Sequence, residues 1–247
     1  MIYNQQHLIK VVIAAAGQGT RSGLEYPKTL FKIKNIPIIV RVCKALSQFD
    51  KCPSIIVAPD WKKEIKNTLI NYEIDAELII QSKPRGMGDA LLQYENSEFY
   101  KNVEHLILIW GDIPFIQNET VDAMVKNHLK KKNTFTFPTR ESNSAYTYVF
   151  RDDSGNVKEL IETRELGIQK PQSGERDIGL FIFKKDPIFA ILKEDLPNRL
   201  GKSTNEHGFL YLVNYLYQRG FKIEALKIAT ELDLVSFNSI DDIGSYL

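Results

Sequence analysis

Short apolar runs alternate with longer amphipathic stretches along the first half of the chain. Apolar runs of this length are typical of buried strands, whereas apolar residues that recur three and four positions apart indicate helices. The predicted strands cover residues 11–16, 54–58, 76–81 and 106–110, and the predicted helices cover residues 37–49, 61–72, 88–95 and 120–129. This alternation predicts an α/β fold in which helices flank both faces of a mostly parallel sheet.

The pattern changes after about residue 135, where strands follow one another more closely. Strands are predicted at residues 134–137, 145–150, 157–162, 178–183 and 222–228, with a turn at 152–155 and an amphipathic helix at 206–219. No internal repeat or low-complexity linker separates the two patterns. We therefore expect one domain over residues 1–247, whose two halves, about 1–135 and about 136–247, share one mixed sheet.

The composition disfavours several classes of protein. Hydrophobic residues make up 43% of the chain, enough for a sizeable core. Lys and Arg number 32 and Asp and Glu 31, a balance that disfavours a general nucleic-acid or membrane-surface binder. Cys43 and Cys52 fit neither a disulfide framework nor a metal motif, residues 1–10 are polar, and no apolar stretch approaches the ~18 residues of a membrane span. We expect a cytoplasmic protein that acts on small molecules, without nucleic-acid or membrane partners; the sequence leaves the oligomeric state open.

The first predicted strand ends in a loop that carries glycines and cations. Gly17, Gly19 and Gly23 follow the strand, and Arg21 and Lys28 lie in and just beyond the loop. Glycines at such a position let the backbone approach a ligand closely. Arg offers a planar fork for phosphate oxygens and Lys a compact charge, so the two cations indicate a polyanion. The combination predicts a site for a nucleoside triphosphate.

Two other interpretations of this loop stay open. It resembles the glycine turn of a dinucleotide-binding domain, which needs an acidic residue at the end of the second strand. Asp60 lies near that position and matches it poorly. The loop is alternatively a structural turn without a ligand.

A second glycine-containing loop follows the third predicted strand. Gln81 both donates and accepts hydrogen bonds, so by flipping its amide it can pair with the edge of either pyrimidine. Gly86 and Gly88 would allow close approach of a ligand and expose backbone amides. Taken alone, this segment is better explained as an ordinary connection between a strand and a helix.

Asp112 follows the strongly apolar strand at residues 106–110. The carboxyl ends of strands are where α/β sheets bind ligands. Mg²⁺ prefers oxygen ligands and often takes only one or two from the protein, which a single carboxylate there can supply. The alternative role is that of a helix N-cap, for which Asp is well suited.

These motifs, in this order, resemble those of the sugar-phosphate nucleotidyltransferases, most of all the uridylyltransferase domain of bacterial N-acetylglucosamine-1-phosphate uridyltransferases. That family carries L-A-A-G-x-G-T-R-M, then L-P-K, then Q-x4-G-T-G-x-A, then Y-G-D-x-P. The matching segments here begin at Ile13, Tyr26, Gln81 and Trp110, with one extra alanine in the first. The resemblance implies a Rossmann-like, GT-A-like mixed sheet flanked by helices. It also implies that the family's C-terminal β-helix domain is absent, because the sequence ends at Leu247.

The resemblance also implies roles for individual residues. It implies a nucleotide-binding first half and an acceptor-binding second half, with Arg21, Lys28 and Asp112 as catalytic residues. Asp112 and Asn238 would hold Mg²⁺, the one cofactor implied. The implied nucleotide-binding residues are Ala15, Ala16, Gly17, Gly19, Thr20, Arg21, Gln81, Gly86 and Met87. The implied acceptor-binding residues are Glu162, Asp177 and Glu206.

Departures from the family pattern concentrate in the acceptor half. The family's N-T-G becomes a segment that starts with Asp177, its Y-Y-x-T-D becomes residues 207–211, and Met87 replaces the Thr of Q-x4-G-T-G. We infer that the nucleotide and metal chemistry is kept while the acceptor has changed. An acceptor with an amine would suit Asp177 and Glu162, as in similar capsule-pathway cytidylyltransferases that act on non-sugar phosphates, for example of the phosphoglutamine type.

The implied activity is transfer of a pyrimidine nucleoside monophosphate from CTP or UTP to a phosphorylated acceptor, with release of pyrophosphate. The acceptor would be a sugar 1-phosphate or an amine-bearing phosphate such as a phospho-amino acid. The product would be a CDP- or UDP-linked precursor of a surface polysaccharide. Three alternatives stay open: a non-catalytic nucleotide-sensing protein of the same fold, an NAD(P)-dependent oxidoreductase, and a glycosyltransferase, although no D-x-D metal motif is present.

Overall fold

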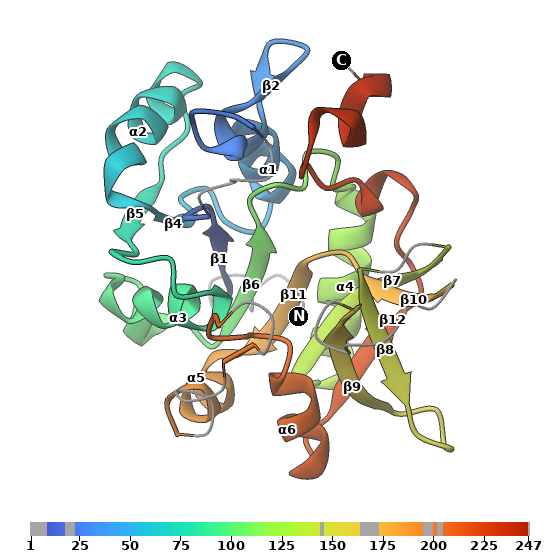
Figure 1. The fold of residues 1–247 in the computed structure, drawn as a ribbon. Coiled ribbons are helices and arrows are strands. Elements are labelled where there is room, and N and C mark those ends of the chain that lie inside the picture. Colours follow the sequence, from blue (N-terminus) through green and yellow to red (C-terminus); the bar gives the residue numbers. More distant parts are fainter. Residues whose placement is uncertain are drawn as a thin grey trace.

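A mixed β-sheet forms the centre of the molecule. The structure, a computed structural model, describes residues 9–17, 23–143, 146–163, 173–194, 200–201 and 205–246. The strands of this sheet are β1 (Ile9–Ala14), β4 (Ser54–Val57), β5 (Glu77–Ile80), β6 (His105–Trp110), β7 (Phe135–Ser142), β10 (Gly174–Asp177), β11 (Leu180–Lys184) and β12 (Ile223–Leu226). Their order is β10-β7-β11-β6-β1-β4-β5, with β12 paired to β7 (Figure 1).

The direction of the strands divides the sheet into two parts. Strands β6, β1, β4 and β5 are parallel, as the alternation of strands and helices predicts. Strand β11 then runs antiparallel to both β6 and β7, and β10 runs antiparallel to β7. The sheet therefore joins the two halves of the chain, and the predicted mixed α/β sheet is confirmed.

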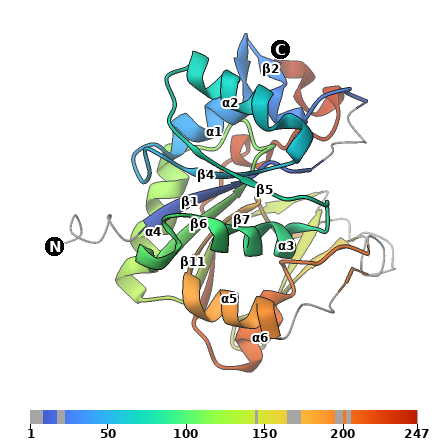
Figure 2. The same cartoon turned by 90° about the vertical axis from the view of Figure 1, so that its left-hand side faces the viewer.

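Helices cover both faces of the sheet (Figure 2). The helices α1 (Ile38–Leu46), α2 (Lys62–Asn71) and α4 (Asn118–Lys131) contribute to one hydrophobic core. The helices α3 (Met87–Leu92), α5 (Lys185–Glu194) and α6 (Leu212–Gln218) contribute to the other. Strand β1 supplies both cores because side chains alternate along a strand: Val11 and Ile13 belong to the first core and Val12 to the second.

Two smaller pairs of strands lie outside this sheet. A hairpin is formed by β2 (Lys32–Ile33) and β3 (Ile36–Pro37), and a ribbon by β8 (Thr147–Arg151) and β9 (Val157–Glu162). The turn of the ribbon is closed by Asp152, whose Oδ1 accepts hydrogen bonds from the backbone N–H groups of Ser154 and Asn156. Among the described residues, none of the helices has both the length and the apolar character needed to cross a bilayer.

The structure corrects several predicted elements. The helix expected at residues 206–219 is confined to Leu212–Gln218. The residues before it pair instead with the start of α3 and the loop before it: His207 N donates to Arg85 O at 2.6 Å, and Gly88 N donates to His207 O at 3.0 Å. Strand β10 and helix α5 were missed. Strand β10 buries charged side chains and so lacks an apolar alternation, and α5 contains a Pro in its first turn, which helices tolerate there.

Candidate active site

The candidate site lies where the parallel strands β1 and β6 end side by side. Ala14 and Trp110, the last residues of these strands, are register partners. Gly111 N donates to Ala14 O at 2.9 Å, which keeps the segments that leave β1 and β6 together. A Cβ on Gly111 would lie 3.0 Å from both Ala14 O and Thr29 Cγ2, so only glycine fits without displacing a neighbour. This close packing places Asp112 directly beside the loop that leaves β1.

Three residues from distant parts of the chain converge at this point. Lys28 Nζ donates to Asp112 Oδ2 at 2.5 Å and to Asn238 Oδ1 at 3.5 Å. The side chains of Lys28 and Asp112 are 16% and 18% exposed, so water screens their attraction less than that of a surface pair. Phe237 N donates to Asp112 O at 2.8 Å, which fixes the C-terminal segment against the end of β6. The predicted grouping of Lys28, Asp112 and Asn238 is therefore present in the geometry.

Two side-chain oxygen atoms converge at this point. Asp112 Oδ2 and Asn238 Oδ1 both face one cationic group, the ammonium of Lys28. Asn238 Nδ2 donates to Ser236 Oγ at 3.1 Å, which directs the amide oxygen toward that cation. No cluster of three or more His, Cys, Asp or Glu side chains suited to a metal occurs among the described residues. One carboxylate and one amide oxygen fit Mg²⁺ that takes its remaining ligands from phosphates and water, so the residues are compatible with this ion.

A cleft extends from this point toward the helix α3. Its cavity volume is about 270 Å³, just below the range of ~300–1,000 Å³ for small-molecule sites, and it opens to solvent. Its wall includes all the predicted nucleotide-binding residues that the structure describes: Ala15, Ala16, Gly17, Gln81, Gly86 and Met87. The predicted residues Gly19, Thr20 and Arg21 lie outside the described residues.

The side chain of Gln81 is held in one orientation. Its Nε2 donates to Asp89 Oδ2 at 2.8 Å and to Gly86 O at 3.1 Å. A carboxylate and a carbonyl oxygen only accept hydrogen bonds here, so the NH₂ end of the amide faces them. The free flipping expected from the sequence is therefore wrong for this arrangement. The Oε1 atom of Gln81 is therefore the end of the amide that a ligand can contact. Asp89, which the sequence analysis did not single out, fixes this orientation.

Gly86 and Gly88 serve the packing of the chain rather than an open approach to a ligand. A Cβ on Gly86 would lie 2.5 Å from His207 O, and a Cβ on Gly88 would lie 2.6 Å from Gly208 O. Gly86 also has φ of +101°, which side chains other than glycine rarely adopt. The two glycines thus let the segment that carries Glu206 lie directly on the loop of Gly86.

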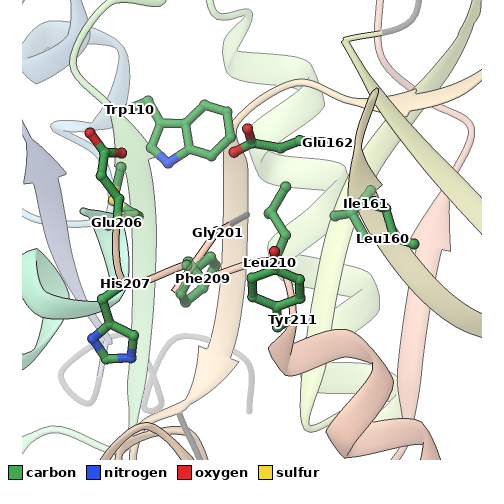
Figure 3. A pocket seen from close by; sticks show the side chains of 12 residues that line it. Trp110, Leu160, Ile161, Glu162, Gly201, Glu206, His207, Phe209, Leu210 and Tyr211 are labelled. Atoms are coloured by element: carbon green, nitrogen blue, oxygen red, sulfur yellow. The ribbon is translucent and has the colours of Figure 1, made fainter. Parts of the chain in front are cut away.

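Beyond Trp110 the cleft continues into a second pocket, shown in Figure 3. Glu162, the last residue of β9, and Glu206 line both spaces together with Trp110. In Figure 3 the Trp110 indole lies between the two carboxylates. Trp110 Nε1 is buried and has no hydrogen-bond partner among the described residues. Two carboxylates beside an aromatic ring suit a positively charged group.

Asp177 lies on the other side of Asp112, in a third space that Lys28, Asp112 and Asn238 also line. Its side chain is buried, and burial raises the pKa of its carboxyl group above the usual value. Asp177 accepts from Thr147 Oγ1 at 2.5 Å and from Gly179 N at 2.7 Å. These bonds join β8 to the turn before β11 and so shape the wall of this space. Arg176, which the sequence analysis missed because it belongs to no motif, lines the same space.

Comparisons with known proteins agree with this geometry. The family described as MobA-like NTP transferase domain matches residues 11–177. The protein called Bifunctional protein GlmU from Thermodesulfovibrio yellowstonii is 29% identical over 233 residues, which are 93% of this chain and 49% of that protein. Its counterpart from Carboxydothermus hydrogenoformans is 28% identical over 232 residues, 92% of this chain and 49% of that protein. The chain thus spans about half the length of the curated relatives it matches.

A solved structure extends the likeness to the fold. A candidate glucose-1-phosphate thymidylyltransferase from Bacillus anthracis, solved in complex with a sucrose, superposes with a TM-score of 0.72. The superposition covers 90% of this chain and 87% of that one at 18% sequence identity. At that identity the likeness concerns the fold alone. It confirms the expected nucleotidyltransferase-type architecture, in which a mixed sheet is flanked by helices.

Proposed function

Since this chain belongs to the MobA-like NTP transferase domain family, we propose that it transfers a pyrimidine nucleoside monophosphate from CTP or UTP to a phosphorylated acceptor and releases pyrophosphate. The product would be a CDP- or UDP-linked precursor of a surface polysaccharide. Residues 1–247 would act as one domain, with nucleotide bound by about residues 1–135 and the acceptor by about residues 136–247. The enzyme would work in the cytoplasm.

One observation carries this proposal: Lys28 Nζ lies 2.5 Å from Asp112 Oδ2 and 3.5 Å from Asn238 Oδ1, at the junction of two clefts. A protein that only binds nucleotide has little need for a cation and a metal-binding carboxylate between two ligand spaces. A transferase needs both, because attacking phosphate and target phosphate are anions that repel each other. The junction is where their charges must be neutralised.

The proposed reaction is one in-line displacement. An oxygen of the acceptor phosphate forms a bond to the α-phosphorus of the nucleotide, and the bond from that phosphorus to the bridging oxygen breaks, so that pyrophosphate leaves with the electron pair. The acceptor phosphate is already an anion, so no side chain has to act as a covalent nucleophile. The protein contributes positioning and charge, with Lys28 near the α-phosphate. Mg²⁺, held by Asp112 and Asn238, would supply further neutralisation and fix the two phosphates relative to each other.

The cleft beside Gln81 is the proposed nucleotide site. Gln81 Oε1 would accept a hydrogen bond from the base, and the backbone at Gly17 would leave room for it, because no atom of the described residues lies within 4 Å of a Cβ added there. Ala15, Ala16, Gly86 and Met87 would form its walls, as they line the same cleft. Gly19, Thr20 and Arg21 are proposed to bind the triphosphate on the strength of the sequence motif alone.

The acceptor is proposed to carry a cationic group. Glu162 and Glu206 present carboxylates on either side of Trp110, an arrangement suited to an ammonium group. Asp177 is buried in the wall of the neighbouring space. It would affect the acceptor indirectly, by holding the Thr147 side chain and the Gly179 backbone in place. An amino sugar 1-phosphate, a phospho-amino acid or a phosphorylated amino alcohol has the required chemistry.

The test is a pyrophosphate-release screen. The purified protein is incubated with each of the four NTPs, with and without Mg²⁺, against glucose 1-phosphate, glucosamine 1-phosphate, phosphoethanolamine and O-phosphoserine. We expect Mg²⁺-dependent release with a pyrimidine NTP and the highest rate with an amine-bearing acceptor. Nucleotide binding by calorimetry without release from any combination would favour the nucleotide-sensing alternative, and binding of NAD(P) in place of NTPs would favour the oxidoreductase.

A further inference from the structure

Arg176 is a partly buried cation that lines a ligand space and forms no ion pair with a carboxylate among the described residues. It lies on β10 and lines the space that Lys28, Asp112 and Asn238 also line. The hydrogen bond recorded for its side chain runs from Nε to the backbone O of Asp177, at 3.3 Å. Among the described parts of the chain, no carboxylate lies within salt-bridge distance of its guanidinium.

The neighbouring arginines of the same sheet region are satisfied. Arg140 is the register partner of Arg176 on β7, and its guanidinium donates to Ala229 O and to Glu231 Oε1, each at 3.1 Å. Arg151 on β8 donates to both carboxylate oxygens of Glu175, at 2.7 and 3.0 Å. The lack of an ion pair at Arg176 therefore sets it apart from two arginines on adjacent strands.

The surroundings of Arg176 make the absence of an ion pair unfavourable in free energy. Burial lowers the pKa of Arg176 from its usual value, and the nearby charge of Asp177 only partly opposes this shift; the guanidinium still keeps its charge at neutral pH. The nearest carboxylate in sequence, Asp177, already accepts from Thr147 and from the backbone of Gly179. Removing a charge from water without pairing it costs free energy, so a protein retains such a group where a ligand supplies the counter-charge.

We propose that Arg176 binds an oxyanion of the acceptor, either oxygens of its phosphate or a carboxylate. The proposal rests on the proposed transferase activity. The nucleotide cleft and the space of Arg176 meet at Lys28, Trp110 and Asp112, which line both. A group bound by Arg176 thus lies on the acceptor's side of the reacting centre. The planar guanidinium suits both oxyanions, since it binds carboxylate and phosphate through paired N–H groups.

The first experiment uses the free protein and two simple probes. Inorganic phosphate and acetate are titrated calorimetrically into the wild type, Arg176→Gln, Arg176→Lys and the control Arg140→Gln. We expect one probe or both to bind the wild type and Arg140→Gln, with a dissociation constant at least tenfold higher for Arg176→Gln and an intermediate value for Arg176→Lys. Equal binding of both probes by the wild type and Arg176→Gln would overturn the proposal.

The second experiment identifies which oxyanion is bound. Phosphoethanolamine and O-phosphoserine differ by one carboxylate, and their KM values are measured with the preferred NTP. If Arg176 binds the acceptor phosphate, the variant Arg176→Gln should raise the KM of both acceptors at least tenfold. If Arg176 binds a carboxylate, the variant should raise the KM of O-phosphoserine alone. The KM of the NTP should not change. An acceptor KM that stays constant in Arg176→Gln would refute the proposal while the transferase activity stands.

A structural role for Arg176 makes a different prediction, which the melting temperature tests. Removing a charge that lacks a partner should leave the melting temperature of ligand-free Arg176→Gln equal to or above that of the wild type. A lower melting temperature, with unchanged probe binding, would show that Arg176 only supports the fold. Arg176-dependent phosphate binding in a protein that releases no pyrophosphate with any NTP would contradict the transferase function and leave the oxyanion site intact.

Discussion

At the scale of single residues, Asp112 is the group on which the proposed chemistry depends most. Its side-chain oxygen faces Lys28, while its backbone oxygen accepts from Phe237 N and so serves the fold. Asp112→Asn keeps the size and the backbone contact but removes the negative charge. We expect kcat to fall about a hundredfold or more, the typical effect of losing one well-aimed charge contact at a reacting centre. Pyrophosphate release measures the rate, and the melting temperature should change little.

The matched control for this variant is Asp60→Asn. Asp60 is exposed beyond the end of β4, where a dinucleotide-binding protein would place its ribose-binding carboxylate. We expect Asp60→Asn to behave as the wild type. An Asp112→Asn protein with most of its activity would contradict the metal assignment, and a large loss in Asp60→Asn would revive the dinucleotide interpretation.

The contact between Asp89 and Gln81 makes a separate prediction about the nucleotide. Asp89→Ala removes one of the two acceptors that hold the Gln81 amide, so the amide can turn and present its NH₂ end. We expect the KM for the NTP to rise about threefold to tenfold, corresponding to a hydrogen bond of ~1 kcal/mol, with the acceptor KM unchanged. Steady-state kinetics measure both constants.

The control for the nucleotide prediction is Asp122→Ala, which removes a carboxylate that pairs with Lys126 on the surface of α4. It should leave both Michaelis constants as in the wild type. If Asp89→Ala raised the acceptor KM as much as that of the NTP, Asp89 would be acting on the whole cleft rather than on the Gln81 amide.

The site was predictable from the sequence only where a residue belonged to a motif. Lys28, Asp112 and Gln81 stand in short patterns of glycine, proline and charge, and the structure brings the first two into contact. Arg176 could not be recognised in this way, because its importance lies in the lack of an ion pair, which depends on the packing of strands far apart in the sequence. Asp89 is only eight residues from its partner Gln81, but their contact depends on how the intervening loop folds.

At the scale of elements, the loop before α3 and the segment before α6 behave as one unit. Gly88 N donates to His207 O, and a Cβ on Gly88 would lie 2.6 Å from Gly208 O. Gly88→Ala should therefore push the segment of Glu206 away from the nucleotide loop. We expect a loss of about 1–3 kcal/mol in the free energy of unfolding, as for other overpacked sites, and higher KM values for both substrates.

Gly244→Ala is the control for the glycine prediction. Within the part of the chain that the structure describes, no atom lies within 4 Å of a Cβ added at Gly244, so this substitution should affect neither stability nor kinetics. Urea unfolding and steady-state kinetics are measured on both variants. A Gly88→Ala protein as stable and as active as Gly244→Ala would mean that the two segments do not depend on each other.

The same contact explains which elements could be predicted. The parallel strands and their helices follow from local apolar periodicity, and they form nearly where that periodicity places them. The helix expected from residue 206 begins at Leu212 because pairing with the α3 loop takes precedence over the apolar pattern of Phe209 and Leu210. Long-range backbone pairing leaves no signal in a single sequence, so the first residue of α6 could not be predicted from the local pattern.

At the scale of the whole molecule, one sheet carries both the site and a buried polar group at the opposite end of β6. His128 is fully buried on α4, with its ring nitrogens 2.9 Å from Thr136 Oγ1 and 3.1 Å from His105 Nδ1. Burial, with smaller effects of His105 and Lys184, lowers the pKa of His128 to about 3. Burial also lowers the pKa of His105, although the neighbouring Glu104 opposes this.

These two histidines make the stability of the protein sensitive to acid. The ordinary pKa of histidine is ~6.5, so below that pH the unfolded chain binds protons that the folded chain does not. Stability is therefore full above pH 6.5 and falls as the pH drops toward 3. For His128 alone we expect the free energy of unfolding to fall by about 2 kcal/mol between pH 7 and pH 5, at up to ~1.4 kcal/mol per pH unit.

The measurement is urea unfolding at pH 7 and pH 5 for the wild type, His128→Gln and His105→Gln. Glutamine keeps hydrogen-bonding groups at these positions without titrating, so His128→Gln should lose about 2 kcal/mol less than the wild type between the two pH values, and His105→Gln should also lose less than the wild type. If His128→Gln does not fold at pH 7, His105→Gln still tests the pair, because the two rings are in contact. Identical pH dependence in the wild type and in His105→Gln would place the acid sensitivity elsewhere in the molecule. His207, whose pKa burial also lowers, would then be the group to examine, and acid stability would be linked to the cleft instead of the far end of the sheet.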